Sequence, residues 1–392
     1  MGHEGHDQLI RLKTGGGVMV RLWFLGAMIV TVGCVSKRDE LQSCYDHVSP
    51  CRPMRAEVME FSPELDAIKP LAPIDVSGWV LASDVLIGTL SNRWLVGISI
   101  KDQKVLWWFE TPSGVTNPLS VMGSWVLVGL RDGRLLKVEA LTGKKVWETQ
   151  LRRFVARPLV LGGATLVAVT ANQQVYAVDF QSGNILWMYD AGEPDNLSIR
   201  TGAPAIVRDK RVFVGTDKGE LHAISLDQGR LEWRYNPAYT DDRFHDVIGE
   251  IVSIGNQIVV SRYDGLVAAI SVSGPEPSVL WKDTLPAITS NSFRSSILFL
   301  GCINGDVYAV DALSGRRIWR APTVMPIASL SPGEKVLYSA GTNGRISALD
   351  MSNGNILWQD DVDGAIDAPP VLFKDRIYFG TGLKALYGFR LL

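Results

Sequence analysis

The sequence predicts an all-β fold, an eight-bladed β-propeller of four-stranded antiparallel blades. Three observations support this fold. A sequence motif that ends in tryptophan recurs along the chain, its period matches the length of one four-stranded blade, and turns that contain glycine divide each copy. The clearest copies run from Val175 to Trp187 and from Val307 to Trp319. The repeat tryptophans, spaced by 40, 40, 46, 48, 38 and 39 residues, are Trp107, Trp147, Trp187, Trp233, Trp281, Trp319 and Trp358.

Every unit predicts the same order of elements. An apolar strand is followed by a glycine turn such as Asp132-Gly133, an alternating strand, a Ser/Thr-Gly turn and the tryptophan strand. Asp179, Asp311 and Asp350 precede the glycine of the second turn, where a carboxylate can accept hydrogen bonds from the turn amides. We expect these aspartates to be structural, and we expect the repeated tryptophan to pack between neighbouring blades.

The last unit predicts how the ring closes. It supplies three strands, Val371–Phe373, Arg376–Phe379 and Ala385–Phe389, and no tryptophan strand follows them. The available fourth strand is the segment from Arg55 to Pro63, ahead of the first full unit. Pairing the two ends of the chain would leave the last blade complete and its sheet edge covered.

The start of the chain predicts an export signal and a lipid anchor. Basic residues precede the apolar run Leu22–Val32, which is too short to span a bilayer as a helix. The run ends in Thr31-Val32-Gly33-Cys34, which resembles the lipobox of bacterial lipoproteins. The resemblance implies a signal peptide over residues 1–33, with Met19 as an alternative start, and lipidation of Cys34. Val35 in place of aspartate implies transfer to the outer membrane.

Two further regions complete the predicted organisation. Residues 34–58 are polar and form a tether, and the propeller occupies residues 59–392. Cys44 and Cys51 in the tether either pair in an oxidising compartment or stay unpaired, and spacing leaves both open. Cys302 lies in an apolar strand and is expected to be an inert buried thiol.

Composition excludes several classes of function. The chain has 39 basic and 41 acidic residues and a net charge of −2, so no excess of positive charge favours binding of a nucleic acid. The 46% of hydrophobic residues exclude a disordered chain. Histidines and cysteines occur without metal-site spacing, so we expect no metal and no cofactor.

The repeat units resemble the PQQ-type propeller repeat, which occurs in quinoprotein dehydrogenases and in non-catalytic relatives. The dehydrogenases carry a vicinal cysteine pair over the quinone, and this chain has no Cys-Cys. We therefore predict that the protein is not an enzyme and has no catalytic residues.

The whole predicted mature chain is more similar to the BamB family of outer-membrane assembly lipoproteins. Asn196–Pro204 is similar to the segment through which that family docks on the barrel protein BamA, and the resemblance implies that Leu197, Ile199 and Arg200 make this contact. Asp242–Val247 resembles a second family loop. That likeness implies roles for Arg243 and Asp246 at the same surface, although Ile248 replaces a second aspartate.

The repeat spacing indicates the same surface independently. The two longest steps flank Trp233 and place enlarged connections at 188–203 and 234–250. Connections of this type emerge on one face of a propeller, so adjacent insertions form one raised patch. Its apolar side chains next to arginine are typical of an interface, whereas the plainer interpretation is a pair of solvated loops.

The sequence thus predicts a periplasmic scaffold, lipid-anchored to the outer membrane, that assists folding and insertion of β-barrel proteins. Its expected partners are BamA, the other subunits of the β-barrel assembly (BAM) complex and unfolded client strands added to exposed sheet edges. Two alternatives stay open, a PQQ-dependent quinoprotein and a propeller scaffold of another envelope complex.

Overall fold

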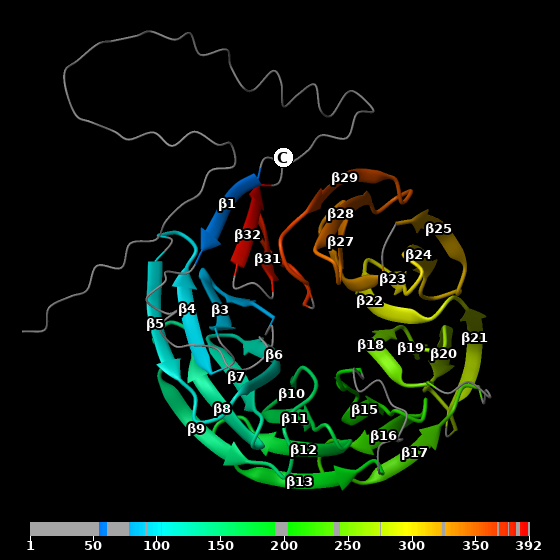
Figure 1. Ribbon diagram of the computed structural model, residues 1–392. Helices are drawn as coiled ribbons and strands as arrows, with labels where there is room; N and C mark the ends of the chain where they lie inside the picture. The colour runs from blue at the N-terminus through cyan, green and yellow to red at the C-terminus, as the bar shows by residue number, and fades with distance from the viewer. Residues whose placement is uncertain are drawn as a thin grey trace, which may run out of the picture.

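The chain forms a ring of eight four-stranded antiparallel sheets around a central axis (Figure 1). The computed structural model describes residues 55–60, 78–90, 93–102, 104–192, 203–238, 244–274, 276–323, 326–366, 368–374, 376–381 and 385–390. Within these ranges it contains strands and turns and no helix, so no helix there is long and apolar enough to cross a membrane. The predicted eight-bladed β-propeller is confirmed.

Blades 1 to 4 follow one another along the chain, each with its strands in sequence order from the axis outward (Figure 1). Their strands are β2 (Val80–Ala82), β3 (Val85–Leu90), β4 (Trp94–Ser99) and β5 (Lys104–Glu110); β6 (Val115–Met122), β7 (Trp125–Leu130), β8 (Arg134–Glu139) and β9 (Lys145–Gln150); β10 (Val160–Gly162), β11 (Thr165–Val169), β12 (Gln174–Asp179) and β13 (Ile185–Asp190); β14 (Ile206–Arg208), β15 (Arg211–Gly215), β16 (Leu221–Ser225) and β17 (Leu231–Tyr235).

Blades 5 to 7 repeat this order, and blade 8 combines the two ends of the described chain. Their strands are β18 (Val247–Ile254), β19 (Gln257–Arg262), β20 (Leu266–Ser271) and β21 (Ser278–Thr284); β22 (Ile288–Arg294), β23 (Ile297–Cys302), β24 (Asp306–Asp311) and β25 (Arg317–Pro322); β26 (Ile327–Pro332), β27 (Val336–Gly341), β28 (Arg345–Asp350) and β29 (Ile356–Asp361); β30 (Val371–Phe373), β31 (Arg376–Thr381), β32 (Ala385–Arg390) and β1 (Arg55–Glu60).

The ring closes as predicted, by pairing β1 with β32. The register runs from Arg55 opposite Phe389 to Glu60 opposite Ala385, and Figure 1 shows β1 lying along β32. β1 begins at Arg55, inside the stretch 34–58 assigned to the tether, so the propeller starts earlier than the sequence boundary at 59. The predicted signal peptide and Cys34, Cys44 and Cys51 lie outside the described residues.

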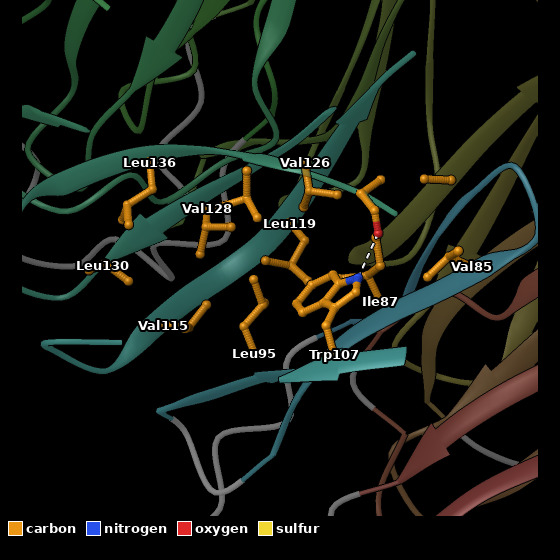
Figure 2. Close-up of a cluster of buried hydrophobic side chains, with 13 residues drawn as sticks. Val85, Ile87, Leu95, Trp107, Val115, Leu119, Val126, Val128, Leu130 and Leu136 are labelled. Carbon is orange, nitrogen blue, oxygen red and sulfur yellow. Dashed lines mark hydrogen bonds between the residues drawn. The ribbon is translucent and has the colours of Figure 1, made fainter. Parts of the chain in front are cut away.

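The core lies between blades. Middle strands such as β12 are buried along nearly their whole length because both faces of the sheet pack on neighbouring blades. Outer strands such as β21 alternate exposed and half-buried side chains, since one of their faces meets solvent. In the cluster of Figure 2, Ile87 and Leu95 of blade 1 pack with Val126 and Leu136 of blade 2.

The repeated tryptophan joins one blade to the next, as predicted. Trp107 Nε1 donates to the carbonyl of Ala140 in blade 2 at 2.8 Å, the dashed line in Figure 2. Trp147, Trp187 and Trp319 donate likewise to Phe180, Leu226 and Met351. The indole ring also covers the turn glycine of the next blade: a Cβ on Gly143 would lie 2.5 Å from Trp107 Cε3.

The turn aspartates have the structural role expected of them. Asp179 Oδ1 accepts hydrogen bonds from the backbone nitrogen and the hydroxyl of Ser182, each at 2.7 Å. Asp311 Oδ1 accepts the same two hydrogen bonds from Ser314. These hydrogen bonds hold the pKa of both carboxyls below the ordinary value. Cys302 is fully buried, and burial raises the pKa of its thiol to about 12, which keeps it protonated.

Candidate partner-binding surface

The connections from the outer strand of one blade to the inner strand of the next share one face of the ring. In a four-stranded meander this connection emerges at the same end as the turn between the second and third strands. The β13–β14 and β17–β18 connections occupy 191–205 and 236–246, where 188–203 and 234–250 were predicted. The second lies inside its predicted range, and the first ends two residues beyond it. They are longer than every other such connection except the one after β1, and they join blade 3 to blade 4 and blade 4 to blade 5.

Most predicted contact residues lie in the parts of these connections that the structure leaves out. Leu197, Ile199, Arg200 and Arg243 are outside the described residues, and the geometry places none of them. Their connections are anchored by described residues on both sides. The buried residues at which the two connections start and end are called the base here. They include Arg157, Asp217, Asp246, Arg262 and Asp264.

Arg157 lies at the centre of that base. It precedes β10 and is only 3% exposed. Its Nη1 donates to the carbonyl of Gly215 at 2.9 Å and its Nη2 to Asp217 Oδ1 at 3.2 Å, both in blade 4. The backbone nitrogen of Asp217 in turn donates to Gln173 Oε1 at 2.9 Å. A buried ion pair thus joins blades 3 and 4 at the face from which the β13–β14 connection leaves blade 3.

A second buried arginine holds the β17–β18 connection. Arg262 at the end of β19 forms a two-point ion pair with Asp264, and both side chains are almost inaccessible. Its Nη1 also donates to the carbonyl of Ala238 at 2.7 Å and to Asn236 Oδ1 at 3.3 Å. The turn of blade 4 allows this close approach through Gly219, whose φ is +74°, because a Cβ there would lie 2.9 Å from the carbonyl of His245.

Asp246 belongs to this buried base. It is 1% exposed, and its carbonyl accepts from the backbone nitrogen of Tyr263 at 3.0 Å. Burial lowers the pKa of Arg157, and the charges of Asp217 and Asp246 oppose that shift. Asp246 therefore acts on Arg157 inside the protein, and its burial argues against the predicted direct contact with a partner. Phe244, two residues earlier, is exposed and packs edge-on against Tyr263.

Next to this base, His222 links blades 3 and 4. Its Nδ1 lies 3.1 Å from the Tyr189 hydroxyl and its Nε2 lies 3.0 Å from Glu220 Oε2. Burial lowers the pKa of His222 and raises that of Tyr189. A neutral imidazole that accepts from Tyr189 and donates to Glu220 satisfies both contacts. Tyr189 is in β13, just before the β13–β14 connection.

Sequence reasoning missed most of this base. Arg157 and Asp217 are 60 residues apart, in different repeat units, and no short motif contains both. Arg262 and Asp264 are close in sequence, but their pattern resembles that of an ordinary turn. A signal was present at Arg157, a charged residue between the apolar residues of Val155–Leu159. Fully buried charges are rare unless they are paired, so this pattern predicts a distant partner.

Comparison with known proteins identifies the family. A family model described as outer membrane protein assembly factor BamB matches residues 91–321 and 303–390. The chain belongs to the BamB family. The BamB of Burkholderia pseudomallei (strain K96243) is 23% identical over 382 residues, which cover 93% of this chain and 96% of that protein. The BamB of Moranella endobia (strain PCIT) is 21% identical over 273 residues, which cover 68% and 70%.

Solved structures agree on the fold. BamB from Moraxella catarrhalis superposes with a TM-score of 0.73 at 16% identity, covering 86% of this chain and all of that one. A europium-containing methanol dehydrogenase superposes with a TM-score of 0.67 at 12% identity, covering 80% of this chain and 90% of that enzyme. At such identities the likeness shows the propeller architecture that BamB proteins and quinoproteins share.

Proposed function

We propose that this BamB-family chain is a non-catalytic scaffold subunit of the outer-membrane β-barrel assembly complex. The observation that carries the proposal is the pair of long connections, β13–β14 and β17–β18, whose described ends lie at a buried, ion-paired base. A preorganised base reduces the entropy lost when connections bind a partner. Lipidation at Cys34 would tether the propeller to the periplasmic face of the outer membrane.

Within this proposal, Leu197, Ile199, Arg200 and Arg243 dock the propeller on BamA. The aliphatic side chains fill apolar pockets, and the arginines form charge-assisted hydrogen bonds with carboxylates or carbonyls. Asp246 supports the surface from below through Arg157. The outer strands add a separate surface: Leu186 and Leu280 are exposed on β13 and β21, where an unfolded client strand can pair with the sheet edge.

Affinity purification from detergent-solubilised envelopes tests the docking assignment. The wild-type chain is expected to recover BamA, and a Leu197/Ile199/Arg200 triple-alanine variant is expected to lose it. A matched control changes Leu141, Leu313 and Arg316 to alanine, since these exposed residues lie at the opposite face of the ring. If the triple-alanine variant recovers as much BamA as the control variant and the wild type, the docking site is wrong. If the wild-type sample contains no BamA, the proposed function is wrong.

A further inference from the structure

A third connection on the same face exposes a basic and aromatic tip. The β9–β10 connection lies one blade before the β13–β14 connection and presents Arg152, Arg153 and Phe154 in succession. All three side chains are exposed, and Phe154 is 38% accessible. Aromatic side chains and arginine are the residue types most enriched at binding hot spots.

The tip is held on a rigid base. On one side the backbone nitrogen of Leu151 donates to the carbonyl of Gly133 at 2.9 Å. On the other, the Phe154 carbonyl accepts from the nitrogen of Ala171 at 3.0 Å, and Val155 forms a β-bridge with Thr170. Arg157 then fixes the end of the connection to blade 4. The exposed residues therefore have a defined position relative to the buried base between blades 3 and 4.

The charges of the tip are not balanced locally. Neither Arg152 nor Arg153 forms an ion pair with any residue that the structure describes. The acidic side chains of the adjoining turn and strand, Asp132 and Glu148, are both engaged by Arg134. A chain whose net charge is −2 thus carries a local positive excess at this tip.

We propose that Arg152, Arg153 and Phe154 form a second contact for the same protein partner and recognise an acidic segment of it that carries an apolar side chain. The inference rests on the proposed function, because the partner is the one bound by the two long connections. The guanidinium groups attract the acidic segment during encounter, and Phe154 covers its apolar residue. Because the arginines are exposed, their contribution is expected chiefly in the association rate and its salt dependence.

Association kinetics with purified BamA provide the test. The wild-type chain, an Arg152→Glu/Arg153→Glu variant and a Phe154→Ala variant are compared at salt concentrations from about 50 to about 500 mM. The charge-reversed variant should associate about tenfold more slowly at low salt and show a flatter salt dependence. Phe154→Ala should mainly accelerate dissociation.

The control is an Arg230→Glu/Arg316→Glu variant, which makes the same charge change in exposed turns at the opposite face. It should keep the wild-type rates, and unchanged thermal unfolding should show that all variants are folded. Wild-type binding with equal rates and salt slopes for both charge-reversed variants overturns this inference and leaves the function intact. Binding to anionic lipid vesicles is measured in parallel. If the Arg152→Glu/Arg153→Glu variant binds BamA as the wild type does but no longer binds the vesicles, the arginines contact lipid and the inference is overturned. Absence of wild-type binding overturns the proposed function as well.

Discussion

At the residue scale, the protein concentrates buried charge beneath one surface. Arg157 and Arg262 are buried, and each donates to a carboxylate and to a backbone carbonyl. A buried pair adds little net stability over an apolar one, but it fixes the geometry of the groups it joins. The pairs therefore explain how the connections over blades 3 to 5 keep a fixed base.

Removing one member of a pair should be costly. Arg157→Met leaves Asp217 and Asp246 buried beside an apolar side chain, so the free energy of unfolding is expected to fall by about 3 kcal/mol or more. Arg317→Met breaks an exposed pair with Asp283 and should cost under about 1 kcal/mol. Urea unfolding measures both, and similar losses would show that the buried pair has no special role.

His222 predicts a pH dependence. Burial lowers its folded-state pKa below the ordinary 6.5, so the unfolded chain binds the proton more readily. Stability should therefore be highest above pH 6.5 and should fall as the pH decreases from 6.5 towards the folded-state pKa. His222→Gln should flatten this part of the curve. Denaturant unfolding between about pH 5 and pH 8 measures it, and identical slopes for both proteins would contradict the assignment.

At the element scale, the glycine that closes the turn before most of the tryptophan strands is required for two separate reasons. Gly315 has a φ of +74°, and its missing Cβ makes room for the ring of Trp281. Gly123 has a φ of +62° but nothing within 4 Å of where a Cβ would lie. Substitution at Gly123 therefore tests backbone strain alone, whereas substitution at Gly315 tests both the strain and the contact with the neighbouring blade.

Alanine at these positions should measure that contact. Gly123→Ala is expected to cost about 1 kcal/mol from backbone strain alone. Gly315→Ala carries the same strain and also displaces the Trp281 ring, which adds about 1–3 kcal/mol. Thermal unfolding of both variants gives the difference. A Gly315→Ala loss no larger than that of Gly123→Ala would mean that the tryptophan contact contributes little.

At the scale of the whole molecule, the architecture could be predicted from the sequence because the same motif occurs in seven units of the chain. Seven tryptophans, the turn glycines and a last unit of three strands were enough to give eight blades and the closing strand. The buried base could not be predicted in the same way. Its pair of Arg157 with Asp217 joins residues of different units, and this pairing is visible only after the ring has closed.

Closure itself predicts the effect of truncation. A chain that lacks residues 1–60 has no β1, so β32 becomes an unpaired edge on which other chains can add. We expect this protein to form oligomers and to unfold at a lower temperature than a chain lacking only residues 1–54. Light scattering and thermal unfolding compare the two. A monomeric truncated chain of equal stability would show that β1 is dispensable for closure.

The most direct test of the central claim is the amount of folded β-barrel protein in the outer membrane of cells that lack this chain. Complementation with the wild-type gene should restore that amount. Complementation with the Leu197/Ile199/Arg200 triple-alanine variant, present at the same level and folded, should not restore it. Full restoration by the variant would contradict docking through the β13–β14 connection, and no dependence on the wild-type gene would contradict the assembly function itself.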